Sequence, residues 1–351
     1  MIYVLQKTNV ILMDPLDGDY MEALERSPLD ANFFHSSYWA RVLARTYGFD
    51  PVYIGRLNGE ELSGLFAVMD VRSAVTGKRG VGLPFSDECP LLCADRSLGI
   101  TLLQEMISVG KKLGWRYLEW RGGDGYCSSA FPSTVYVGHT VDLTLGEGGL
   151  IRSFRDSTRR NIQKAQKEGV EVQVRSDTES LLAFYGLQCF TRKRHGLPPQ
   201  PWSFFKAFWE EVIKPARGFI VLGSLNGEPV AGAIFVACGK KALFKYGASR
   251  EEAQHTRANN LVMWEGIKEC ARRGCIELSL GRTEHTNTGL LQFKRGWGGK
   301  ESSIPYFRYD LKRDKFVASK AMERSPLNRI FSKFPLTLLK LAGALLYRHM
   351  A

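Results

Sequence analysis

The chain has 351 residues, 44% apolar and 24% charged, and its 48 Lys and Arg exceed 36 Asp and Glu to give a formal net charge of +12. These fractions are typical of a globular protein, and the length allows two domains that each bury a core. Seven cysteines without a CxxC pair exclude a disulfide framework and a zinc ribbon, and favour a reducing cytoplasm. The positive charge favours a polyanionic partner, with solubility as the simpler alternative.

The sequence pattern of the first half of the chain predicts one mixed α/β unit. Residues 1–20 lack the basic start, apolar core and cleavage site of a secretory signal and are interpreted as a first strand. A helix is predicted to begin at Ser36 or Ser37, with Trp39 on its apolar face. The pattern then predicts three elements: a type I′ hairpin at 57–68, a helix at 102–113 and a strand at 115–121.

A strongly basic segment opens the second half and is predicted to form a helix that ends at Gly169, which supplies a left-handed C-cap. Apolar periodicity then predicts a strand from 170, a helix at 178–194, a helix from Ser203, strands at 219–224, 229–238 and 242–248, a helix at 259–274 and a strand at 275–281. Hairpins followed by a strand-helix-strand crossover describe a mixed sheet, because only a crossover can join parallel strands.

The two halves of the chain repeat each other. The segment "LNGEELSGLFAV" returns as "LNGEPVAGAIFV", and "LGWRYLEWRG" aligns in the same order with "RGCIELSLGR". The period is far longer than that of a solenoid repeat, so it indicates two copies of one domain. The predicted organisation is a domain at 1–150, a catalytic domain at 151–315 and a basic amphipathic tail at 316–351.

One ordered series of motifs resembles a known family. The series is "RRNIQKAQKEGVEV", "TRKRHGLPP", "FKYGAS", "NNLVMWEGIKECARRG", "LSLGR" and "GLLQFKRGWGG". In this order it resembles the second domain of Fem-type peptidoglycan-bridge aminoacyltransferases and their GNAT-like acetyltransferase relatives. The resemblance implies an α/β fold of two tandem GNAT-like domains, and transfer of an acyl group from aminoacyl-tRNA or acyl-CoA to an amine, with no bound cofactor.

The turn expected to hold the acyl donor departs from the usual acetyl-CoA pattern. Acetyl-CoA-dependent GNAT domains usually carry R/Q-x-x-G-x-G/A here, whose amides hold the pyrophosphate at a helix N-terminus. In this chain the turn reads "QHTRANNL" and lacks those glycines, which favours aminoacyl-tRNA over acetyl-CoA. Arg257 and the amides near Asn259 and Asn260 remain candidates for a phosphate contact.

Lys294 in "FKRGWGG" matches the lysine that the family carries in its active-site region. An amine that attacks an ester or thioester needs stabilisation of the developing oxyanion, and a fixed ammonium can supply it or neutralise a phosphate. The alternative is a surface lysine on a short helix. The resemblance favours a catalytic role for Lys294.

Further substrate-binding candidates follow from the same motifs. Arg194 and His195 precede a Pro-rich loop suited to an anionic acceptor, and Arg282 ends the motif "LSLGR". Lys245 and Tyr246 end a central strand, where sheets of this kind open a crevice for ligands. The alternatives are a solvated helix end for Arg194 and His195, and a core position for Tyr246.

Two sets of candidates lie outside this group. Arg160 and Lys164 are expected on one broad helix face that could follow the nucleic-acid backbone of a donor, with a plain solvated face as the alternative. In the first half, Trp39 and Asp87 match positions that line the acceptor cleft in the family. For Trp39, core packing is the favoured alternative.

The segment 325–351 lies beyond the resemblance. Lys333 and Lys340 interrupt its apolar residues and leave no run near the roughly 20 residues needed to cross a bilayer. Its leucine stripe and basic residues predict an interfacial helix on an anionic membrane. Packing against the protein's own domains is the equal alternative.

The six histidines have no metal-ligand spacing, so no metal site is expected, and neither G-x-S-x-G nor a Walker loop is present. We therefore expect a cytoplasmic acyltransferase that joins an aminoacyl or acyl group to an amine of a nucleotide- or lipid-linked precursor of the cell wall or envelope. The alternatives are an acyl-CoA-dependent N-acetyltransferase acting on an amino sugar in polysaccharide biosynthesis, and a non-catalytic basic protein that binds RNA or a membrane.

Overall fold

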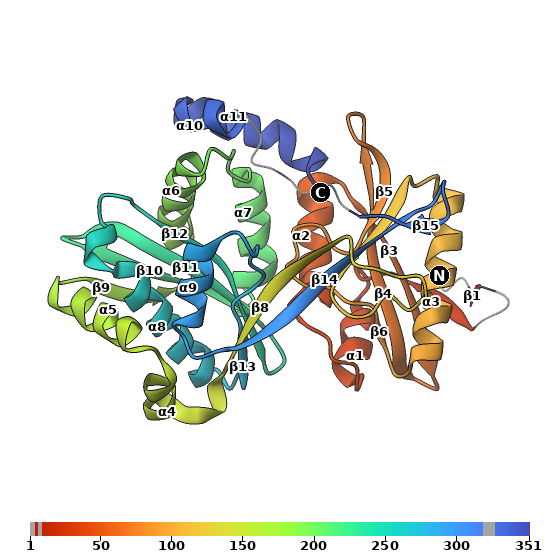
Figure 1. The fold of residues 1–351 in the computed structure, drawn as a ribbon, viewed down its shortest axis with the longest axis horizontal. Helices are drawn as coiled ribbons and strands as arrows, with labels where there is room; N and C mark the ends of the chain where they lie inside the picture. Colours follow the sequence, from red (N-terminus) through yellow and green to blue (C-terminus); the bar gives the residue numbers. More distant parts are fainter. Residues whose placement is uncertain (1–3, 6–8, 319–326) are drawn as a thin grey trace. The chain divides into compact units, whose positions relative to one another are not determined.

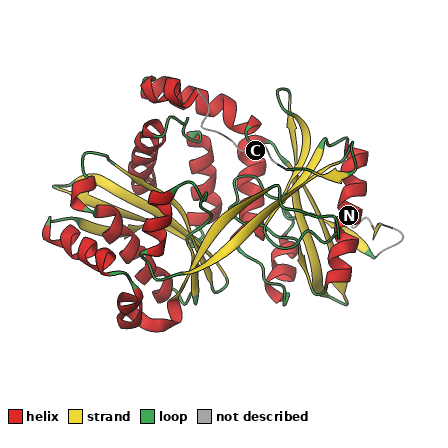
Figure 2. Ribbon diagram, viewed as in Figure 1, coloured by secondary structure: helices red, strands yellow, loops and turns green. Residues whose placement is uncertain are grey.

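The computed structural model describes residues 4–5, 9–318 and 327–351, in two compact units. Unit 1 comprises Met1–Tyr136, Ser303–Ala321 and Arg348–Ala351, and unit 2 comprises Val137–Ser302 and Met322–Tyr347. Both units consist of strands flanked by helices (Figure 2). Parts of the predicted first strand (1–3 and 6–8) and of the predicted tail (319–326) lie outside the described residues.

Unit 1 holds a mixed sheet in the strand order β1-β2-β3-β4-β5-β7-β14, with β6 beside β4 and β15 beside β14. Helix α3 covers one face of this sheet, and α1 and α2 cover the other (Figure 1). The elements are β1 (Val4–Leu5), β2 (Val10–Met13), α1 (Gly18–Arg26), α2 (Ser37–Tyr47), β3 (Asp50–Asn58), β4 (Glu61–Ser73), β5 (Gly77–Val81), β6 (Leu92–Cys93), α3 (Arg96–Leu113), β7 (Tyr117–Arg121), β14 (Lys300–Asp310) and β15 (Lys315–Phe316).

Unit 2 holds strands in the order β8-β13-β12-β11-β10-β9. Helices α5 and α8 cover one face, and α6 and α7 cover the other (Figure 1). The elements are β8 (Thr134–Asp142), α4 (Gly146–Ser153), α5 (Asp156–Lys167), β9 (Glu171–Arg175), α6 (Thr178–Arg194), α7 (Trp202–Phe208), β10 (Gly218–Leu225), β11 (Glu228–Cys238), β12 (Lys241–Ser249), α8 (Ala258–Arg272), β13 (Glu277–Ser279), α9 (Thr288–Arg295), α10 (Leu327–Lys333) and α11 (Leu336–Leu346).

The internal repeat is visible in the connectivity of both units. In unit 1 the antiparallel strands β3, β4 and β5 lead through α3 to β7, which is parallel to β5 with Gly80 opposite Leu118. In unit 2 the antiparallel strands β10, β11 and β12 lead through α8 to β13, which is parallel to β12 with Ala242 opposite Leu278. The predicted mixed α/β fold with a hairpin and a crossover in each half is confirmed.

The boundary between the units differs from the predicted one at residue 150. The chain leaves unit 1 within β8, at Tyr136, and returns to it within β14, at Ser303. The second half of β8 belongs to unit 2 because it pairs with β13, with Val141 opposite Leu278. The sequence analysis assigned no strand to β8 or β14, so the exchange of segments was missed.

Local signals set several element boundaries. The side chain of Ser36 accepts from the amide of Trp39 at the start of α2, and Gly48 ends that helix with a φ of 67°. The second hairpin has Asn226 and Gly227 at positive φ, as a type I′ turn requires. In the first hairpin, however, Asn58 pairs with Glu61 at the end of the ladder, so the two turn residues are Gly59 and Glu60. Only Gly59 has a positive φ, and a type I′ turn needs two such residues. The type I′ prediction for this hairpin was therefore wrong.

Close packing of α8 on the sheet depends on a glycine in the middle of the helix. A Cβ placed on Gly266 would overlap the ring of Phe235, which is fully buried in β11. Alanine is the better helix former by about 1 kcal/mol, but overpacking a rigid core costs about 1–3 kcal/mol. We therefore expect Gly266→Ala to lower the free energy of unfolding by about 1 kcal/mol, measured by denaturant titration.

The matched control is Gly186→Ala, in the middle of α6, where a Cβ would meet no heavy atom within 4 Å. Without a clash, the loss of backbone entropy in the unfolded chain should raise the free energy of unfolding by about 0.5–1 kcal/mol. If both substitutions stabilise the protein, the close approach of α8 to Phe235 is contradicted.

No described helix is long and apolar enough to cross a membrane.

Candidate functional site

Two parallel strands of unit 2 separate after a short ladder. Strands β12 and β13 pair over only three positions, of which the last is Leu243 opposite Ser279. Beyond this point β12 continues to Ser249 in contact with β11. The chain after β13 stays beside β8 instead, where the amide of Leu280 donates to the carbonyl of His139 at 2.8 Å. The edge of β12 beyond Leu243 therefore has no ladder partner on this side among the described strands.

A β-bulge lies at the point where β12 leaves β13. Ile234 of β11 is opposite Tyr246, and Phe235 is opposite Phe244, so Lys245 is an extra residue on β12. Bulges of this kind re-aim a side chain and occur frequently beside active sites. The Nζ of Lys245 lies 5.2 Å from the ring centroid of Tyr246. The structure thus places both predicted residues on the part of β12 that no longer pairs with β13.

Tyr246 also belongs to an aromatic cluster under α7. Its ring centroid lies 6.3 Å from that of Phe204, 5.6 Å from Phe205 and 6.2 Å from Phe208. The side chain is half-buried. Packing, the alternative for Tyr246, therefore accounts for much of its environment.

The predicted donor turn forms the start of α8. Arg257 is exposed and has a φ of 62°, a left-handed conformation that costs a residue with a side chain roughly 1–2 kcal/mol. Backbone strain of this kind clusters at functional sites. Asn259 is half-buried, whereas Asn260 is buried and its amide donates to the carbonyl of Arg257 at 2.8 Å. The expected phosphate contact of Asn260 is therefore disfavoured, because its amide is already bonded and its side chain is covered.

Lys294 on α9 is directed at the backbone of the segment that follows β13. The residue is only 3% exposed, and its Nζ donates to the carbonyl of Gly281 at 2.8 Å and to that of Arg282 at 3.0 Å. The surface-lysine alternative is wrong, because the ammonium is buried. In this structure the ammonium fixes the segment that follows β13, and the side chain of Arg282 on that segment is half-buried.

His139 is a buried neighbour of this segment that the sequence analysis did not select. It lies on β8, and its Nε2 is 3.2 Å from an Oε1 of Glu301. The pKa of His139 is lowered, mainly by burial. The Glu301 carboxylate raises the pKa in part, and the positive charges of Lys294 and Arg295 lower it further. The neutral imidazole is therefore favoured. A lone histidine in a strand without metal-ligand spacing offered no signal in the sequence.

The other basic candidates fall on both faces of the sheet of unit 2. Arg160 and Lys164 are exposed on α5, which packs against α8 on the face that carries the donor turn. Arg194 is the last residue of α6 and is half-buried, and His195 follows it and is exposed. Because α6 covers the opposite face, the structure does not gather all the basic candidates into one surface.

In unit 1, a strained loop presents Asp87. Leu83 and Phe85 have φ values of 46° and 61°, which are unusual for bulky side chains. Arg121 donates from Nη1 to the carbonyl of Ser86 at 3.0 Å, and the hydroxyl of Tyr306 donates to the carbonyl of Asp87 at 2.8 Å. The loop is therefore held by buried side chains, as expected of a binding loop on a rigid scaffold.

The arginine that holds this loop is itself held by a buried carboxylate. Glu119 contacts Arg121 at 3.2 Å and Arg308 at 2.6 Å. Burial by itself would raise the pKa of Glu119, but the two guanidinium charges outweigh it and the net pKa is lowered. Glu119 therefore stays ionised and positions Arg121.

Trp39 is not part of a binding surface. It is fully buried, with ring centroids of Phe33 and Phe34 at 5.9 and 5.4 Å. An acceptor could not touch this ring without unfolding the core around it. The expected substrate contact of Trp39 is therefore corrected to core packing, the alternative considered for it.

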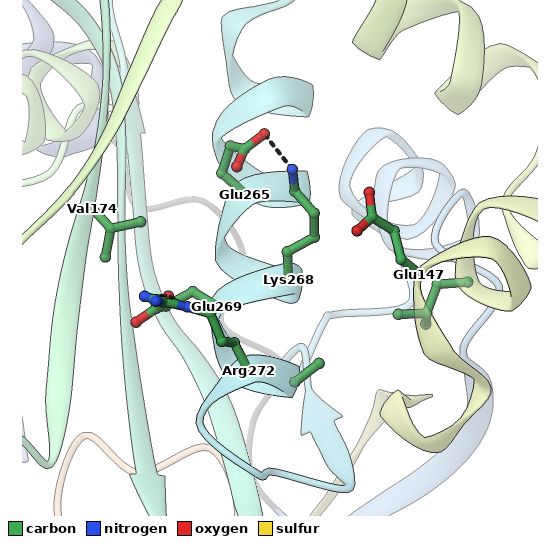
Figure 3. A pocket seen from close by; sticks show the side chains of 8 residues that line it. Glu147, Val174, Glu265, Lys268, Glu269 and Arg272 are labelled. Atoms are coloured by element: carbon green, nitrogen blue, oxygen red, sulfur yellow. Dashed lines mark hydrogen bonds and ion pairs between the residues drawn. The ribbon is translucent and has the colours of Figure 1, made fainter.

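A pocket of about 530 Å³ lies elsewhere in unit 2, beside α4, β9 and the last turns of α8 (Figure 3). Four of the five charged side chains that line it form ion pairs, since Lys268 contacts Glu265 at 2.9 Å and Glu269 binds Arg272. None of the predicted site residues lines it, and it lies at the opposite end of α8 from Arg257. Volume alone therefore does not make it the site of the predicted chemistry. Among the residues that the structure describes, no cluster of three His, Cys, Asp or Glu could hold a metal ion.

Comparison with known proteins gives a domain match and several similar folds. Residues 152–295 match the acetyltransferase (GNAT) domain family. The fold is similar to that of FemX, with 14% identity over 85% of this chain and 96% of that one and a TM-score of 0.67. It is also similar to a tandem GNAT protein from the clavulanic acid biosynthesis pathway (10% identity, 86% and 98% coverage, TM-score 0.56). A third similar fold is L-PGS from Bacillus licheniformis (14% identity, 93% and 97% coverage, TM-score 0.55). A search of curated protein sequences found no match.

Proposed function

We propose that this chain, whose residues 152–295 match the acetyltransferase (GNAT) domain and whose fold is similar to those of FemX and a tandem GNAT protein, transfers an aminoacyl group to an amine of a cell-envelope precursor. The observation that carries the proposal is the early end of the ladder between β12 and β13, with the bulge of β12 at Lys245 beside it. The strained donor turn at Arg257 lies on the crossover helix of the same domain.

The reaction needs few groups from the protein. The neutral amine of the acceptor adds to the acyl carbonyl, a C–N bond forms, and the ester bond to the donor breaks as its oxygen leaves with a proton. The developing oxyanion requires fixed hydrogen-bond donors in a site shielded from water. Along the open edge of β12, alternate backbone N–H groups point away from β11, and these are the donors that we assign to the oxyanion.

The donor turn supports aminoacyl-tRNA over acyl-CoA. A pyrophosphate can approach a helix N-terminus most closely where glycines leave the backbone without side chains. In this turn the residue with the left-handed backbone conformation is Arg257, which has a bulky side chain. The exposed Arg160 and Lys164 lie on α5, which packs against the donor helix and extends the positive surface. This arrangement suits a long polyanion better than a single pyrophosphate.

The acceptor and the compartment complete the proposal. The Fem-type resemblance implies an amine on a nucleotide- or lipid-linked cell-wall precursor, and Arg194, His195 and Asp87 are our candidates for contacts with it. All seven cysteines are free in the structure, which is the usual state in a reducing compartment. We place the reaction in the cytoplasm.

A second candidate is an acyl-CoA-dependent N-acetyltransferase that acts on an amino sugar in polysaccharide biosynthesis. The match of residues 152–295 to the acetyltransferase family favours it. A third candidate, a basic protein that binds RNA or a membrane without turnover, is favoured only by the net charge of +12.

Thermal unfolding with each donor separates these candidates. A ligand that binds only the folded state at one hundred times its Kd stabilises the protein by about 2.7 kcal/mol. We expect aminoacyl-tRNA to raise the melting temperature, and acetyl-CoA to leave it unchanged. Arg257→Ala should reduce the shift, because the variant removes the exposed cation at the donor turn.

Uncharged tRNA and an assay of amide formation are the controls. A shift with acetyl-CoA alone would favour the second candidate. Equal shifts with charged and uncharged tRNA, without amide formation on any amine acceptor, would favour the RNA-binding protein.

A further inference from the structure

The C-terminal helix α11 packs on unit 2 through one face. Leu339 is fully buried, and a Cβ on Gly343 would collide with the carbonyl oxygen of Pro199. Tyr347, just after the helix, accepts a hydrogen bond at its hydroxyl from Nη2 of Arg192 at 2.6 Å. These three positions are spaced by four residues, so they form one stripe along the helix. The predicted packing of the tail on its own protein is observed for this face.

The opposite face of α11 carries large apolar side chains in solvent. Leu338, Leu341 and Leu345 are 49%, 58% and 62% exposed, and they lie about half a turn away from Leu339 and Gly343. Ile330 on α10 is 50% exposed as well. Single exposed leucines are ordinary, but a continuous stripe on a helix that is already anchored marks an interaction surface.

The charge around this stripe has one sign. Residues 327–351 include Arg329, Lys333, Lys340 and Arg348, and no Asp or Glu. Nearby, the Nζ of Lys340 lies 5.3 Å from the ring centroid of Tyr185, which is 5.2 Å from that of the partly exposed Trp202. Leucines flanked by cations and a Trp are the composition that binds the headgroup region of an anionic bilayer.

We propose that α10 and α11 form a docking surface for an anionic lipid bilayer, with Leu338, Leu341 and Leu345 inserted among the headgroups. The inference does not depend on acyl transfer. The 11 residues of α11 extend about 16 Å, about half the thickness of the hydrocarbon core, so the helix lies in the interface. Because Leu339 and Tyr347 fix the helix to unit 2, the surface is rigid and loses little entropy on docking.

A second copy of the chain is a poorer occupant. A stable interface buries about 800 Å² on each partner, more than the six exposed apolar side chains of this segment can supply (Ile330, Leu338, Leu341, Leu345, Leu346 and Met350). Two such surfaces would also bring like charges together, since the segment holds no acidic residue.

Co-sedimentation of the full chain with vesicles tests the proposal. We expect binding to phosphatidylcholine vesicles that contain phosphatidylglycerol, and weaker binding to pure phosphatidylcholine. Leu341→Glu with Leu345→Glu should reduce the bound fraction about tenfold or more, because charge replaces the inserted side chains. The matched control is Thr337→Glu with Ala344→Glu, which adds the same charge at exposed positions of α11 outside the stripe.

The control pair should keep most of the binding, and both double variants should keep the wild-type melting temperature. Arg329→Gln with Lys333→Gln should weaken binding to the anionic vesicles and leave the weak binding to pure phosphatidylcholine unchanged. Equal loss in the two glutamate pairs would overturn the inserted stripe. Self-association of the wild type that Leu341→Glu with Leu345→Glu abolishes, without vesicle binding, would show that a second copy is the occupant.

Point variants are preferable to removal of the tail. Deletion would also take away Leu339 and Tyr347, which are buried, and would expose the surface of α6 that they cover.

Discussion

Lys294→Met should lower the turnover of acyl transfer on the order of 100-fold and the free energy of unfolding by about 2 kcal/mol. The substitution keeps the aliphatic packing but leaves the carbonyls of Gly281 and Arg282 without their donor in a buried place. The segment after β13 then loses its fixed position, and misplacement of a segment of the site by about 1 Å can cost about 100-fold in rate. In this account Lys294 is a positioning residue, and direct contact with the acyl carbonyl remains a separate prediction.

Steady-state kinetics with circular dichroism melting measures both effects. A positioning role predicts a fall in kcat with a smaller change in KM, whereas a phosphate anchor for the donor predicts a rise in KM with kcat preserved at saturation. Lys294→Arg, which retains a cation able to donate to both carbonyls, should recover part of the rate.

The control is Arg295→Gln, the next residue on α9, which is exposed and paired with Glu301. Its effect on stability should stay within about 0.5 kcal/mol. Arg194→Met is a second control, expected to weaken acceptor binding with little effect on the saturated rate. Full activity and full stability of Lys294→Met would contradict every role for this ammonium.

Glu119→Gln should lower the free energy of unfolding by about 3–5 kcal/mol, because it leaves the buried guanidinium of Arg121 without its counter-charge. The side chains of Glu119 and Arg121 are only 11% and 9% exposed, so water cannot replace the lost ion pair. The matched control is Glu22→Gln, which removes an exposed pair with Arg26 and should cost less than about 0.5 kcal/mol.

The cost of Glu119→Gln should depend on pH in one direction. The folded-state pKa of Glu119 lies below its ordinary value of 4.5, so the carboxylate stabilises the fold fully above that value. This contribution is lost as the pH falls through the folded-state pKa, where the native carboxylate takes up a proton. The stability difference between the wild type and Glu119→Gln should therefore shrink below pH 4.5. A difference that stays constant down to the acid transition would contradict the ion pair.

Much of the fold was predictable because its signals are local. Asn-Gly turns, glycine caps and helix periodicity identified the hairpins and both crossover helices, and the long-period repeat identified the tandem arrangement. The exchange of strands was not predictable in this way. Strands β8 and β14 are set by pairing with residues more than a hundred positions away, such as Val141 with Leu278 and Tyr306 with Arg121.

The candidate site was predictable in its elements but not in its contacts. The sequence placed Lys245, Tyr246 and the turn at Arg257 on the right elements. It could not show that the ammonium of Lys294 turns toward backbone carbonyls, or that Asn260 and Trp39 are covered, because burial is decided by tertiary packing. His139 was not predicted, because a single histidine in a strand, without metal-ligand spacing to other residues, gives no signal in the sequence.

The return of the chain to unit 1 at Ser303 has a consequence for synthesis on the ribosome. Unit 1 begins the chain, yet its strand β7 lacks its neighbour β14 until residues 306–310 have emerged, after the whole of 137–302. Unit 1 therefore cannot be completed first, as the N-terminal domain of a chain usually is. Until then the edge of β7 in the nascent first half is unpaired and is open to pairing with other chains.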